Sequence, residues 1–78
     1  MNEDLAKRVY HEAREYYLDS FTGYKVAIAH VEWKGKVRWM ALSYEQIGDD
    51  VTLVTIHPCR RNQIENRVKL GRWVHYES

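Results

Sequence analysis

Three consecutive strand-like stretches, separated by short glycine turns, constrain the fold of this chain more than any other feature. They run from Tyr24 to Trp33, from Lys36 to Glu45 and from Val51 to His57. All three are rich in β-branched and aromatic residues, which is typical of strands. The turns at residues 34–35 and 48–50 are short enough to join only antiparallel neighbours. We therefore expect a three-stranded antiparallel meander.

The alternation within these stretches predicts which side chains the sheet buries. Along the second stretch, one face would carry Val37, Trp39 and Ala41, and the other Arg38, Met40, Leu42 and Tyr44. The third stretch is apolar on both faces, so we expect it to be a central strand. The expected buried core comprises Leu5, Val9, Ala13, Val26, Ile28, Met40, Leu42, Leu53, Val54, Ile56, Ile64 and Val68.

An amphipathic helix is expected before the strands. Asn2 can cap it, and two acidic residues follow in its first turn, where they favour the helix dipole. Apolar side chains then recur every three to four residues, at Leu5, Val9, Ala13 and Tyr16/Tyr17. This stripe predicts a helix of about four turns that ends near residues 19–23 and packs across one face of the sheet.

A second helix and a last strand are expected after the meander. Pro58 would end the third strand, and residues 60–70 would form a short helix closed by Gly71 in a left-handed conformation. Residues 72–77 alternate and predict a fourth strand. The expected fold is a single α+β domain over residues 1–78. Its N-terminal helix packs on a four-stranded antiparallel sheet, and a short helix precedes the last strand.

Several classes of protein are disfavoured by the composition. The single cysteine, Cys59, leaves neither an internal disulfide nor a multi-cysteine zinc site, and we expect no metal and no cofactor because no HExxH pattern, aspartate cluster or Walker loop occurs. No apolar run approaches the roughly 18 residues of a membrane span. The N-terminus is acidic and helical in pattern rather than like a secretion signal, so a cytoplasmic protein without membrane contact is expected.

The charge of the chain is divided unevenly. Residues 1–56 contain seven Lys or Arg against nine Asp or Glu, whereas residues 57–78 contain five against two. Within the second helix Arg60, Gln63 and Arg67 share one face, with Asn66 beside them. Guanidinium and amide groups so arranged suit phosphate oxygens, because Arg donates in a planar fork and stays charged. An ordinary solvated helix face is the alternative.

Two histidines flank this arginine-rich segment. His57 ends the third stretch and His75 lies in the last strand. Histidine titrates near neutral pH, so such a pair could act as general base and general acid in RNA transesterification, while cations hold the charge on the phosphorane. A structural role, such as a hydrogen bond to a carbonyl, is the alternative. His11 and His30 have no partner at ligand spacing and are expected to be structural or exposed.

The layout and two motifs resemble a known superfamily. A leading helix, a meander that ends in VTLVTIHP, an arginine-rich segment and a final GRWV are similar to the RelE/barnase-like small ribonucleases, most specifically over TIHPCRRNQIENRVKLGRW. The resemblance implies a helix-plus-four-strand core and RNA cleavage without a metal. It also implies a toxin of a toxin–antitoxin pair, with an antitoxin protein as partner.

These observations give two sets of candidate residues. The predicted catalytic residues are His57, Arg60, Arg67 and His75. The predicted nucleic-acid-binding residues are Arg38 and Tyr44, whose positions on the second strand the resemblance implies, together with Arg61, Gln63, Asn66 and Arg72. We thus expect a small metal-independent endoribonuclease that acts on RNA rather than DNA. The alternatives are a non-catalytic nucleic-acid-binding module that uses the same basic face, and a protein-interaction domain whose basic helix meets an acidic partner.

Overall fold

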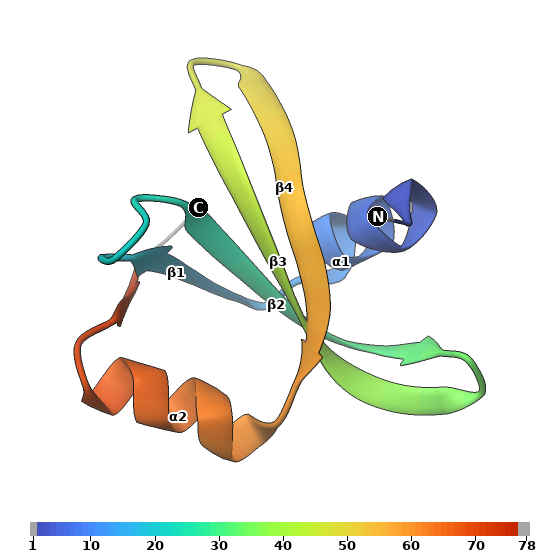
Figure 1. Ribbon diagram of the computed structural model, residues 1–78. Coiled ribbons are helices and arrows are strands. Elements are labelled where there is room, and N and C mark those ends of the chain that lie inside the picture. Colours follow the sequence, from blue (N-terminus) through green and yellow to red (C-terminus); the bar gives the residue numbers. More distant parts are fainter. Residues whose placement is uncertain (1, 77–78) are drawn as a thin grey trace.

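The computed structural model describes residues 2–76 and shows an α+β fold (Figure 1). The elements are α1 (Glu3–Glu12), β1 (Glu15–Asp19), β2 (Lys25–Trp33), β3 (Lys36–Ile47), β4 (Asp50–Cys59), α2 (Arg61–Lys69) and β5 (Trp73–His75). Neither helix is long and apolar enough to cross a membrane. The N-terminal helix, the antiparallel sheet and the short helix before the last strand confirm the expected α+β class.

The five strands form one antiparallel sheet in the order β4-β3-β2-β1-β5. The meander expected from the sequence is confirmed, and the hairpin turn between β2 and β3 has positive φ at Lys34 and Gly35, as a two-residue turn of this kind requires. β5 does not pair with β4, which precedes it in the chain, but with β1 at the opposite edge. The chain must therefore cross the sheet between β4 and β5, and α2 makes this crossing (Figure 1).

The first helix is shorter than predicted, and over residues 2–76 the sheet has five strands rather than four. α1 ends at Glu12, Ala13 is already extended with ψ at 139°, and the residues expected to form its last turns make strand β1. Tyr16 and Tyr17 continue the helical spacing of the apolar stripe, but aromatic residues also favour strands. Pairing of β1 with β2 on one side and β5 on the other settles the ambiguity in favour of the strand.

The prediction that the third stretch is central was wrong, because β4 is an edge strand among the described residues. Its apolar residues are correspondingly less covered. Val54 is 37% exposed, and Leu53 and Ile56 are only partly buried. The strand also continues through Pro58, opposite Met40, where an edge position tolerates the missing N–H.

The core consists of two clusters, one on each face of the sheet. On the α1 face lie Leu5, Ala6, Val9, Ala27, Ala29, Val31, Met40, Leu42 and Tyr44. On the α2 face lie Tyr17, Val26, Ile28, Ala41, Cys59, Ile64 and Trp73. Seven of the predicted core residues are confirmed as buried: Leu5, Val9, Val26, Ile28, Met40, Leu42 and Ile64. Ala13 is only partly buried, and Val68 is 39% exposed because Ile64 alone anchors α2.

Local caps follow the sequence closely. The side-chain oxygen of Asn2 accepts a hydrogen bond from the Leu5 N–H at 3.0 Å, which caps α1 as expected. At the end of α2, Gly71 has a φ of 77°, and the Arg72 N–H donates to the Arg67 carbonyl at 3.0 Å. This left-handed closure turns the chain into β5.

Shortening a side chain in the α1-face cluster should destabilise the protein strongly. Leu42 is fully buried, so Leu42→Ala removes apolar contacts and leaves a cavity, and should lower the free energy of unfolding by about 2–5 kcal/mol. Ile47→Ala is the matched control, because Ile47 is 70% exposed and its loss should change stability by no more than about 0.5 kcal/mol. Urea unfolding measures both, and equal effects would contradict this core.

Candidate functional site

Four side chains with acid, base or cationic groups meet on the α2 face of the sheet; we call them the Glu15 cluster. They are Glu15, Tyr17, Arg61 and His75. Arg61 Nη1 donates to Glu15 Oε2 at 2.5 Å, and the Tyr17 hydroxyl donates to Glu15 Oε1 at 2.7 Å. The β1–β5 register places Tyr17 opposite His75, and their rings meet edge to face with centroids 5.5 Å apart. Three elements thus contribute to one cluster.

The cluster holds Glu15 as a carboxylate and Tyr17 as a phenol. The hydrogen bond from Arg61 lowers the pKa of Glu15 more than burial raises it. Burial, together with the bond to Glu15, raises the pKa of Tyr17 to about 12. The Glu15 side chain is 24% exposed and that of Arg61 42%, so both groups remain accessible to a ligand from solvent.

Arg61 extends the cluster toward the β2–β3 hairpin. Its guanidinium lies over the Trp39 ring at 5.0 Å, and His30 stacks on the same ring with centroids 4.4 Å apart and planes 10° from parallel. The order His30, Trp39, Arg61, Glu15 forms a row of polar and aromatic side chains across the sheet. Aromatic and guanidinium planes of this kind can stack on unpaired bases.

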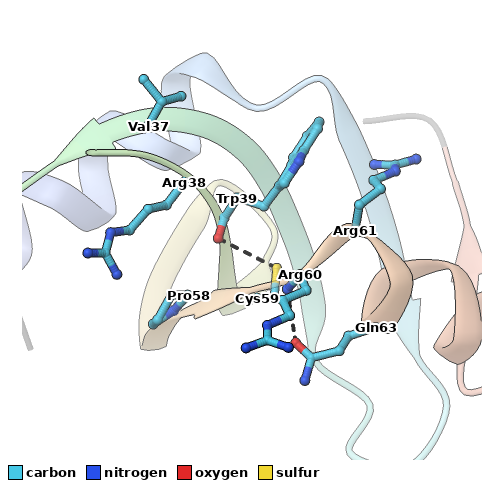
Figure 2. A pocket seen from close by; sticks show the side chains of 8 residues that line it. All are labelled: Val37, Arg38, Trp39, Pro58, Cys59, Arg60, Arg61 and Gln63. Carbon is cyan, nitrogen blue, oxygen red and sulfur yellow. Dashed lines mark hydrogen bonds between the residues drawn. The ribbon is translucent and has the colours of Figure 1, made fainter.

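A pocket of about 660 Å³ opens where β4 leaves the sheet and α2 begins. We call it the arginine pocket; its lining residues are Val37, Arg38, Trp39, Pro58, Cys59, Arg60, Arg61 and Gln63 (Figure 2). Within residues 2–76, Arg38 and Arg60 form no ion pair, whereas Arg61 is paired with Glu15. The pocket therefore brings together four of the predicted site residues: Arg38, Arg60, Arg61 and Gln63.

His57 and Arg67 lie on the same face, beside this pocket. The His57 residue is exposed on β4, yet the protein atoms that surround its ring desolvate it; this desolvation first, and then the nearby charge of Arg67, lowers the pKa of His57. Arg67 also covers the Trp73 ring at 4.9 Å. Asn66 is exposed on the same helix. Arg67 and Asn66 thus lie on α2 near His57, and the Arg67 side chain also packs on Trp73.

Other predicted residues are not brought together with this surface. His57 and His75 lie on strands at opposite edges of the sheet, about 19 Å apart if the sheet were flat, since neighbouring strands are about 4.8 Å apart. Tyr44 is buried on the α1 face, where its hydroxyl bonds that of Tyr76. Arg72 pairs with Asp19 at 3.5 Å, in the turn after α2.

Sequence reasoning missed Glu15, Tyr17, His30 and Trp39 as parts of a site. The expected helix over this segment would place Glu15 and Tyr17 on different faces. In a strand, residues two apart share a face, so reading 15–19 as a strand would have grouped them. The His30–Trp39 pair could have been predicted from the sequence, because the two-residue turn at 34–35 sets position 30 opposite position 39.

Comparison with known proteins gives no guide to function: the chain matches no family model, no curated protein and no solved structure. Across residues 2–76, no three His, Cys, Asp or Glu side chains gather closely enough to hold a metal ion. The Glu15 cluster and the arginine pocket are therefore the features of the structure that bear on function.

The Glu15–Arg61 pair should make a pH-dependent contribution to stability. Because the pKa of Glu15 is lowered in the folded protein, this contribution is present above the unfolded pKa of about 4.3 and is lost as the pH falls through the folded value. For a pair this exposed, Glu15→Gln should cost about 0.2–1 kcal/mol at pH 7, and the difference from wild type should shrink toward pH 3.

Urea unfolding at pH 7, 5 and 3 measures this difference. Glu45→Gln is the matched control, since Glu45 is exposed and is not ion-paired with any described residue. A gap between wild type and Glu15→Gln that does not change with pH would contradict the ion pair.

Proposed function

We propose that this protein is a metal-independent endoribonuclease that cleaves RNA by attack of the 2′-hydroxyl. The observation that carries the proposal is the Glu15 cluster: a carboxylate kept ionised by Arg61, with an imidazole nearby, on an exposed face. A base, a cation and a second proton-transfer group are the three parts that this reaction requires. The basic surface of α2 beside the cluster suits a polyanionic substrate.

The proposed reaction uses side chains alone. Glu15 takes the proton of the 2′-hydroxyl, and the 2′-oxygen attacks the adjacent phosphorus. The bond from phosphorus to the 5′-oxygen then breaks, leaving a 2′,3′-cyclic phosphate, and His75 gives its proton to the departing 5′-oxygen. Arg61 opposes the negative charge that develops on the equatorial phosphate oxygens. Water restores both protonation states.

Arg61 gives the cluster a switch in basicity. In the free protein its hydrogen bond is the largest cause of the lowered pKa of Glu15. When Arg61 turns toward a bound phosphate, its hydrogen bond to Glu15 weakens and the pKa of Glu15 rises. A base is more effective when its pKa approaches the working pH, so substrate binding would itself activate Glu15. In this scheme His57, Arg60 and Arg67 bind substrate, and His57 is not the general base.

A non-catalytic RNA-binding module is the second candidate. The arginine pocket favours it, because two guanidinium groups that are unpaired within residues 2–76 can bind phosphate without any acid or base. The two candidates share a surface and differ only in whether product forms.

Removal of either proton-transfer group should suppress cleavage. Glu15→Gln and His75→Ala should each lower the rate on single-stranded RNA by roughly two to four orders of magnitude, with an unchanged circular dichroism spectrum. Mass spectrometry should find products ending in 2′,3′-cyclic phosphate, and EDTA should leave the rate unchanged. Glu45→Gln, at an exposed position near the end of β3, is the control and should keep wild-type activity.

RNA that binds without forming any product would exclude the nuclease and support the binding module. Cleavage that persists in Glu15→Gln at the wild-type rate would exclude this cluster as the site of reaction.

A further inference from the structure

The arginine pocket has the chemistry of an anion site. Three of its eight lining residues are arginines, and within the described chain no acidic residue lines it. Arg38 and Arg60 are unpaired within residues 2–76, and Arg38 Nε is buried there without a hydrogen-bond partner. In the view of Figure 2, Pro58 lies between the ends of these two guanidinium groups. A negatively charged ligand would satisfy donors that the protein leaves free.

Backbone geometry at this point reinforces the charge. The β3–β4 ladder ends at the pair Trp39–Cys59, so the chain leaves the sheet and begins α2 beside the pocket. The first turn of α2 contains no acidic residue, and Gln63 Oε1 accepts the Arg60 N–H at 2.9 Å. The positive end of the helix dipole therefore adds to the field of the arginines.

The pocket also adjoins the Glu15 cluster, because Arg61 belongs to both. The Arg61 guanidinium donates to Glu15 and lies over Trp39, which lines the pocket. Arg61 and Trp39 therefore connect the pocket to the reacting groups, whereas Arg38 projects from the other side of β3, with its guanidinium 6.0 Å from the Trp33 ring. The volume of about 660 Å³ exceeds that of a phosphate, and Val37, Trp39 and Pro58 supply apolar walls for a sugar or a base.

We propose that the arginine pocket binds the phosphate next to the one that is cleaved, so that RNA is held at two consecutive phosphates. This inference rests on the proposed nuclease function for its substrate, but the anion site itself does not depend on cleavage. A trinucleotide, which has two phosphodiesters, is the shortest RNA that fills both positions. A dinucleotide fills only one.

Binding at the pocket is tested with inorganic phosphate. In a titration followed by amide NMR, the wild-type N–H signals of Arg61, Asn62 and Gln63 should shift and saturate. The double variant Arg38→Gln/Arg60→Gln should lose these shifts, whereas the charge-matched control Lys7→Gln/Lys25→Gln should keep them. Wild-type signals that do not respond, or a double variant that responds like wild type, would overturn the site. The wild-type titration decides even if the double variant fails to fold.

Use of the pocket by RNA is tested with substrate length. Because hydrogen bonds to charged groups are the stronger kind, wild-type protein should cleave a trinucleotide with a kcat/KM about tenfold above that of a dinucleotide. The ratio should fall to about one in Arg38→Gln/Arg60→Gln and persist in Lys7→Gln/Lys25→Gln. On longer single strands, losing one phosphate contact should flatten the slope of log affinity against log salt by about 0.7.

These experiments distinguish failure of the second phosphate position from failure of the nuclease function. A trinucleotide advantage that survives in the arginine double variant would overturn the second phosphate position and leave the nuclease intact. Saturable phosphate shifts without cleavage of any RNA would exclude the nuclease. The pocket would then stand as an anion site, and the claim that it serves a cleaved substrate would be overturned.

Discussion

The path of α2 across the sheet brings together residues that are far apart in the sequence. Because β5 pairs with β1 and not with β4, the chain must travel from one edge of the sheet to the other. Ile64 fixes α2 on the sheet, and the crossing brings Arg61 within hydrogen-bonding distance of Glu15, 46 residues earlier in the chain. The same crossing opens the arginine pocket at its start and, through β5, places His75 opposite Tyr17.

Much of this fold was predictable where local signals agree with one another. The alternation of Met40, Leu42 and Tyr44, and the turn at 34–35, specify the β2–β3 hairpin and its buried face. The prediction was wrong where one segment carries both a helical and a strand pattern. Residues 15–19 continue the helical spacing of α1 and also suit a strand, and only pairing with β2 and β5 decides between them. The apolar pattern of β4 resembles that of a central strand, although β4 lies at the edge.

Part of the candidate site could likewise be predicted from local sequence, and part could not. The arginine pocket draws on Arg60, Arg61 and Gln63, which are close in sequence, and adding Arg38 needs only the β3–β4 ladder. The Glu15 cluster needs the closure of β5 on β1, which no local pattern indicates. His57 and His75 are only 18 residues apart in the sequence, which suggested that they act as a pair. In the structure they lie on the two opposite edge strands, β4 and β5. Proximity along the chain was a poor guide to proximity across the sheet.

In the proposed reaction Arg61 controls the basicity of Glu15, and the pH dependence of kcat/KM measures this control. This parameter reports the free protein, in which the pKa of Glu15 is lowered by Arg61. The acid-side inflection for RNA cleavage should therefore lie below the ordinary glutamate value of about 4.3, and should move upward in Arg61→Gln. An inflection that stays in place when Arg61 is replaced would contradict the account.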